Sequence, residues 1–109
     1  MSDNIGGMGS VSPEEKAIFK QDYARGANLF QESLIEYEKT TDDHKKIKFK
    51  QVMDEASQVM NETAQLCLSR KGQKLEKILE EDYQQFNISS SQENIEKLHK
   101  DISEIQKKL

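Results

Sequence analysis

The chain has 109 residues, of which 33% are charged and 34% hydrophobic, and its formal net charge is −4. This length fits one ordinary domain, and the thin apolar fraction is typical of long helices that bury one stripe and expose the rest to water. The acidic balance leaves no positive field to attract nucleic acid or anionic lipid, so neither is an expected partner.

The first eleven residues predict a disordered N-terminal arm, 1–11. This segment contains Gly6, Gly7 and Gly9, and its few apolar residues follow no helical period. It lacks the basic and apolar regions of a secretory signal, and no stretch of the chain approaches the roughly 18 apolar residues that span a bilayer. We therefore expect a cytoplasmic protein without a membrane partner, while export by a route independent of a signal peptide stays open.

A single helical domain is expected over 12–109, and its first helix begins after Ser12. Ser12 offers a capping hydroxyl, Pro13 suits the first helical position, and Glu15 completes the spacing of a capping box. One face of this helix then carries apolar side chains three or four residues apart: Phe19, Tyr23, Ala27, Phe30, Leu34 and Tyr37.

A second long helix is expected after the turn at Thr40 to Asp43, where several side chains can cap a helix. Its main apolar stripe consists of Phe49, Met53, Ala56, Met60, Ala64, Leu68, Leu75, Leu79 and Phe86. A second stripe beside it contains Val52, Val59 and Leu66, and so wide an apolar arc needs two partners. Gly72 can either end this helix as a C-cap or stand inside it. Because the main stripe keeps its phase across Gly72, we favour one helix that runs through the glycine and can bend there.

A short last helix is expected after the turn cluster Asn87 to Ser91, where Ser90 and Glu93 have the spacing of a second capping box. Its apolar seam is the most regular in the chain: Ile95, Leu98, Ile102, Ile105 and Leu109. About two heptads are too short to form a stable helix alone in water. The seam should therefore pack antiparallel on residues 75–86, within one chain or across a dimer.

Together these elements predict an all-α fold, an elongated antiparallel helical hairpin with a short third helix packing back on it. The expected arrangement has three helices and is coiled-coil-like. In size, polar arm and hairpin, the chain resembles the small subunits and chaperones of bacterial secretion machines, a likeness of shape that implies a helical partner-binding protein.

The sequence contains no signature of catalysis, of a bound metal or of a cofactor. Glycine-rich nucleotide loops, zinc-ligand spacings and nucleophile elbows are all missing from it. His44 lies at a helix start beside two aspartates and His99 flanks the last seam, so both are interpreted as helix-surface residues. Cys67, between two leucines, is interpreted as a buried thiol. We expect no enzyme, cofactor, metal or small-molecule substrate.

The remaining hypothesis is a non-catalytic protein–protein interaction or assembly module that binds itself or another protein. Its candidate interaction residues are Val52, Val59, Leu66, Ile95, Leu98, Ile102, Ile105 and Leu109. The alternative is a small cytosolic chaperone or structural component of a bacterial secretion apparatus. A nucleic-acid role for the basic runs 44–50 and 69–74 is less favoured, because Phe49 belongs to the core stripe and is not free to stack on a base.

Overall fold

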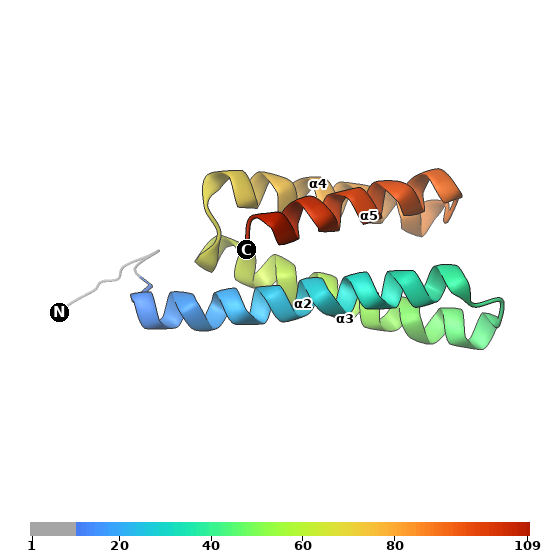
Figure 1. The fold of residues 1–109 in the computed structure, drawn as a ribbon, viewed down its shortest axis with the longest axis horizontal. Coiled ribbons are helices and arrows are strands. Elements are labelled where there is room, and N and C mark those ends of the chain that lie inside the picture. Colours follow the sequence, from blue (N-terminus) through green and yellow to red (C-terminus); the bar gives the residue numbers. More distant parts are fainter. Residues whose placement is uncertain (1–10) are drawn as a thin grey trace.

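The computed structural model describes residues 11–109 and folds them into four helices, α2 Pro13–Lys39, α3 Asp43–Cys67, α4 Arg70–Ile88 and α5 Gln92–Lys107. The expected N-terminal arm lies outside the described residues except for Val11. Successive helices run in opposite directions along one axis (Figure 1). The fold is all-α and somewhat elongated, measuring 56 × 23 × 22 Å with a radius of gyration of 15.4 Å.

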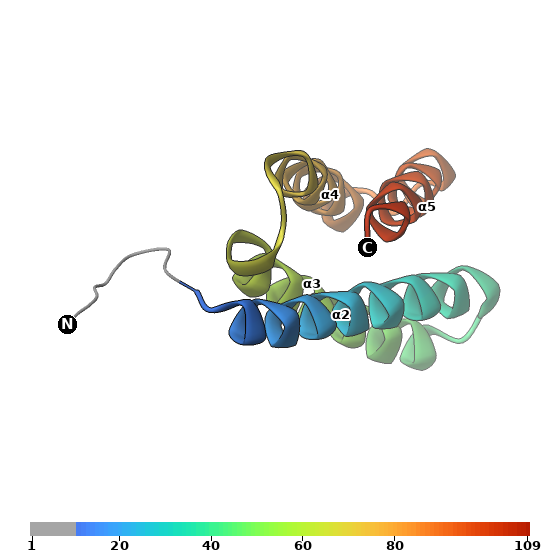
Figure 2. The ribbon, with the colours of Figure 1, turned by 60° about the vertical axis from the view of Figure 1, so that its left-hand side comes forward.

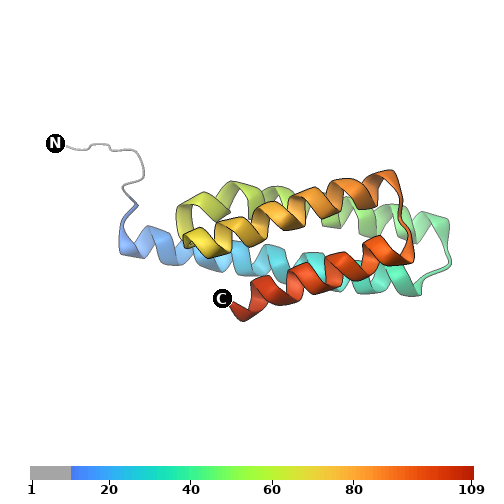
Figure 3. The ribbon, with the colours of Figure 1, turned by 90° about the horizontal axis from the view of Figure 1, so that it is seen from above.

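The four helices pack as two hairpins, one laid on the other. Helices α2 and α3 form the first pair and α4 and α5 the second, which Figure 2 shows as two layers. Between the layers, α4 contacts α3 and α5 contacts α2, as the view from above shows (Figure 3). Each helix therefore has two neighbours, and α3 packs on both α2 and α4.

The prediction of three helices is wrong, because the expected long second helix is two helices. Helix α3 ends at Cys67, and Leu68 and Ser69 adopt extended backbone before α4 begins. The Ser69 hydroxyl caps α4 by accepting a hydrogen bond of 3.3 Å from the backbone N–H of Gly72. A Cβ atom at Gly72 would lie 3.0 Å from the Cβ of Leu68, so glycine allows the chain to fold back tightly here.

The other helix starts lie close to the predicted positions. Ser12 and Glu15 form the expected capping box, in which the Ser12 hydroxyl accepts from the Glu15 N–H at 3.1 Å and the Glu15 carboxylate accepts from the Ser12 N–H at 3.4 Å. Asp42 caps α3, inside the expected turn. Helix α5 is capped by Ser91, one residue after the expected Ser90.

The core contains most residues of the predicted apolar faces, whereas Phe19, Tyr37, Phe49, Leu68 and Leu75 are only half-buried. Two edge-to-face aromatic pairs join α2 to α4 across the bundle, Phe30 with Tyr83 at 5.1 Å and Tyr37 with Phe86 at 5.3 Å between ring centroids. The buried apolar side chains are Tyr23, Ala27, Phe30, Leu34, Met53, Ala56, Met60, Ala64, Cys67, Leu79, Tyr83, Phe86, Ile95, Leu98, Ile102 and Ile105. Every helix contributes to this single cluster.

Candidate interaction site

The structure divides the predicted interaction residues into a covered group and an open group. Ile95, Leu98, Ile102 and Ile105 are buried in the core, where α5 packs antiparallel on α4 as expected and also on α2, which was not expected. Leu109, at the end of the same seam, is 37% exposed. In the open group on α3, Val52 and Leu66 are half-buried and Val59 is exposed.

Val52 and Val59 line an apolar groove formed by α2 and α3 alone. Leu29 of α2 and Val59 of α3 stand at its sides, with 44% and 38% of their surface exposed. Gly26 and Ala56 are buried and form its floor. The complete lining is Asp22, Arg25, Gly26, Leu29, Val52, Glu55, Ala56 and Val59. We call this surface the hairpin groove.

The hairpin groove exists because α2 and α3 approach each other closely at small residues. A Cβ atom at Gly26 would lie 3.0 Å from Met60 Cγ and 3.3 Å from the carbonyl oxygen of Ala56. Contacts this tight leave no room for a side chain larger than glycine at that position, so the larger side chains stand on either side of the gap. Leu29 lies off the Phe19–Tyr37 face and was not predicted as part of a site.

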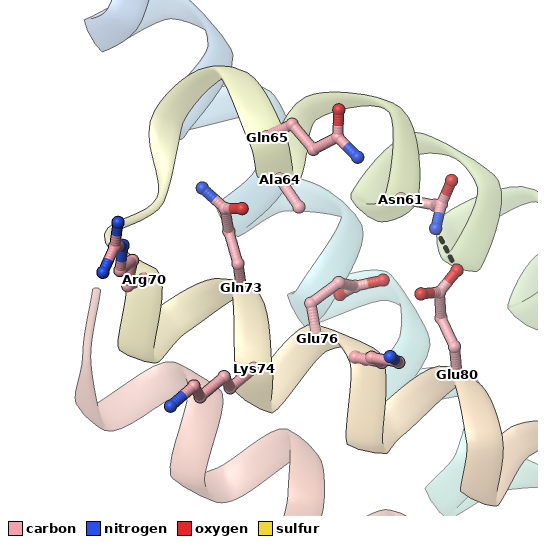
Figure 4. A pocket seen from close by; sticks show the side chains of 9 residues that line it. Asn61, Ala64, Gln65, Arg70, Gln73, Lys74, Glu76 and Glu80 are labelled. Carbon is pink, nitrogen blue, oxygen red and sulfur yellow. Dashed lines mark hydrogen bonds between the residues drawn. The ribbon is translucent and has the colours of Figure 1, made fainter.

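A second hollow, between α3 and α4, is lined mainly by polar side chains (Figure 4). Its most buried ionisable residue is Glu76, which is 3% exposed. The Tyr23 hydroxyl donates to Glu76 Oε1 at 2.8 Å, whereas Oε2 has no hydrogen-bond partner among the described residues. At the edge of the hollow, the Asn61 amide donates to Glu80. The full lining is Asn61, Ala64, Gln65, Arg70, Gln73, Lys74, Glu76, Lys77 and Glu80.

Burial has the largest effect on the pKa of the Glu76 carboxyl. It raises the pKa of the carboxyl from an ordinary 4.5 to about 7; the nearby Glu80 charge also raises it, and the Tyr23 hydrogen bond partly opposes the rise. Asp101, between α4 and α5, behaves similarly, because burial and the adjacent Asp82 carboxyl raise its pKa from 3.8 to about 7. Two acids therefore hold protons in the folded chain that they would release in the unfolded chain near neutral pH.

The folded chain should consequently lose stability as the pH rises from about 4.5 to about 7, since only the folded state keeps the Glu76 proton in that interval. The contribution of Glu76 is present below this window, declines through it and is constant above it. The shift corresponds to about 3 kcal/mol. In Glu76→Gln, which stays neutral, the difference in thermal stability between pH 5 and pH 8 should be smaller than in the parent chain by the contribution of Glu76, whereas the contribution of Asp101 should remain.

The control for this measurement is Glu81→Gln, an exposed change on the same helix that also removes one carboxylate. It should retain the parent's difference between pH 5 and pH 8. Equal pH profiles for Glu76→Gln and the parent would contradict the assignment of a buried proton to Glu76.

His99 connects α5 to α2 and is only partly a surface residue. Its Nε2 lies 2.9 Å from Glu38 Oε1, and Gln92 donates to the other oxygen of the same carboxylate at 2.9 Å. The hydrogen bonds from Gln92 and His99 lower the pKa of Glu38. These contacts fix one end of the outer layer against the first hairpin.

Three comparisons, with protein-family models, with curated proteins and with solved structures, find no match for this chain. In the part of the chain that the structure describes, no three His, Cys, Asp or Glu side chains are grouped so that they could hold a metal ion. None of the four described helices combines the length and apolar character that crossing a membrane requires. The geometry of the hairpin groove is therefore the basis for the functional proposal.

Proposed function

We propose that the chain is a non-catalytic helical interaction module that associates with a second copy of itself through the hairpin groove. The observation that carries the proposal is the gathering of exposed apolar side chains around a concave apolar floor. Leu29 and Val59 flank the floor made by Gly26 and Ala56. Single exposed apolar residues are ordinary, but apolar side chains grouped around a concavity are typical of a contact surface.

The charges at the rim support a second copy as the occupant. Arg25 lies 3.7 Å from Asp22 within the chain, and Glu55 also lines the groove, so the groove carries both signs of charge. A two-fold dimer places one patch against itself, and residue i of one copy meets residue j of the other in both directions. In such a pair, the arginine of each copy can face a carboxylate of the other while Leu29 enters the gap above Gly26.

The double variant Leu29→Glu/Val59→Lys tests this proposal without changing the net charge. Both side chains are partly exposed, so the folded monomer should keep its helicity and melting temperature nearly unchanged. Self-association should weaken at least tenfold, or about 1.4 kcal/mol, because two charges replace the apolar contacts. Light scattering over a range of concentrations measures the effect.

A matched control places the same two charges elsewhere on the surface. Ile78→Glu/Ile88→Lys changes two isoleucines of α4 that are 45% and 79% exposed and do not line the groove. The control should associate as the parent does. A parent chain that stays monomeric at millimolar concentration, or equal weakening in both double variants, would contradict the proposal. The secretion-apparatus role stays an alternative prediction.

A further inference from the structure

Among the four described helices, α4 has the N-terminus whose charges suit the helix dipole least. Helices α2, α3 and α5 each have an acidic residue in the first turn, as the helix dipole favours. Helix α4 has none and begins instead with Arg70 and Lys71. Positive charges at a helix N-terminus are repelled by the positive end of the helix dipole. If the helix continued upstream, Arg70 and Lys71 would lie in its interior, away from that end.

Only two residues, Leu68 and Ser69, separate the two helices. Their backbone is extended, with φ −98° and ψ 150° at Leu68 and φ −67° and ψ 172° at Ser69. If both became helical, a single helix would run from Asp43 to Ile88. The apolar side chains are compatible with this state, because Leu68, Leu75, Leu79 and Phe86 fall on one stripe across the junction.

We infer that the Leu68–Ser69 junction is a hinge through which two copies of the chain exchange their α4–α5 hairpins. In the exchanged dimer α3 and α4 form one continuous helix, and α4–α5 of each copy packs on α2–α3 of the other. This interface is separate from the hairpin groove, which α4 and α5 do not line, so the inference does not depend on the proposed function.

The surface that each exchanged hairpin would cover is already complementary to it. The same contacts join the layers in the closed chain and would join two chains after exchange, including Tyr23 with Glu76 and Phe30 with Tyr83. Exchange separates α4 from α3 and α5 from α2, and each of these two contacts is less extensive than the contact within either hairpin. The equilibrium between the closed monomer and the exchanged dimer therefore depends mainly on the conformation that Leu68–Ser69 favours and on the chain concentration.

Two hinge variants should move this balance in opposite directions. Ser69→Ala/Gly72→Ala removes the cap of α4 and places a Cβ 3.0 Å from that of Leu68 in the closed state, whereas both alanines suit a continuous helix. Arg70→Pro should favour the closed chain over the continuous helix. Proline suits the first helical position of α4, as Pro13 does after Ser12 in α2, and it disrupts the interior of a continuous helix.

The test measures both the mass and the distance across the hinge. Spin labels at Asn61→Cys and Glu80→Cys, in a Cys67→Ala background, replace two side chains that are hydrogen-bonded in the closed chain. On one continuous helix they would be on the order of 28 Å apart. The labelled chain is mixed with an excess of unlabelled chain, so that each labelled copy pairs with an unlabelled one. The measured distance then lies within a single copy. The alanine double variant should raise the dimer association constant at least tenfold and show the long distance, and Arg70→Pro should show neither.

A monomeric alanine double variant, or a dimer of it that keeps only the short distance, would overturn the exchange. The second result would leave association through the hairpin groove intact. Should the double variant fail to fold, the parent chain and Arg70→Pro are compared at high concentration. A long-distance fraction present in the parent and lost in Arg70→Pro supports the hinge, and equal fractions in the two overturn it.

Discussion

Replacing Phe30 by alanine is expected to lower the free energy of unfolding by about 3 to 5 kcal/mol. The Phe30 ring is fully buried at the centre of the bundle and packs edge-on against Tyr83 at 5.1 Å. Its removal takes away the buried ring and leaves a cavity between α2 and α4 that the neighbouring helices can fill only in part. Chemical denaturation followed by circular dichroism measures the loss, and the melting temperature should fall by more than about 10 °C.

The neighbouring residue supplies a matched control for this variant. Leu29 is on the same helix but is 44% exposed, so Leu29→Ala should change the stability of the monomer by less than about 1 kcal/mol. Equal losses in the two variants would show that the face containing Phe30 is not the core face of α2.

The double change Ile102→Asp/Ile105→Asp should release α5 from the bundle. Both isoleucines are at most 2% exposed, and burying two unpaired carboxylates there would cost several kcal/mol. Helix α5 packs mainly on α4, so the amides from Leu75 to Phe86 should lose protection together with those of α5. Hydrogen exchange followed by mass spectrometry measures this loss segment by segment.

The control Ser103→Asp/Lys107→Asp adds the same two carboxylates to the exposed face of α5. It should leave the protection of residues 75–86 close to that of the parent. If the buried double variant also left those amides protected, the docking of α5 on α4 would be contradicted.

Local chemistry explains which features of the fold could be predicted from the sequence. A helix start such as Ser12 to Glu15 depends on groups within four residues of each other, so its signal is complete in the sequence. The buried faces follow from the helical period in the same way, and Tyr23 and Phe30 lie where that period places them.

The break at Leu68–Ser69 could not be predicted by the same reasoning. The apolar stripe has the same phase whether the chain continues or folds back, because both arrangements bury Leu79 and Phe86. Ser69 is of a residue type that caps helices, but Arg70 and Lys71 follow it, and positive charges are unfavourable in the first turn of a helix. The choice between the two arrangements depends on the packing of α4 against α3, which local patterns do not contain.

The sites were only partly predictable for a related reason. Val52 and Val59 were predicted from their spacing, whereas Leu29 joins them only through the register of α2 against α3. The hydroxyl of a buried tyrosine usually has a hydrogen-bond partner, so the sequence indicates that Tyr23 has one. Its partner Glu76 is 53 residues away in the sequence, and only the tertiary fold selects it among the many acids of the chain.

The close packing of α2 against α3 at Gly26 also affects the order in which the helices pack during synthesis. The two most extensive contacts, α2 with α3 and α4 with α5, join helices adjacent in the sequence, and such local connectivity is associated with rapid folding. Synthesis delivers the N-terminal part of a chain first. The α2–α3 pair, which has the most extensive contact, therefore emerges from the ribosome before α4 and α5 and can pack first. During that interval the face containing Tyr23 and Phe30 is uncovered, and it stays uncovered until α4 and α5 emerge and pack on it.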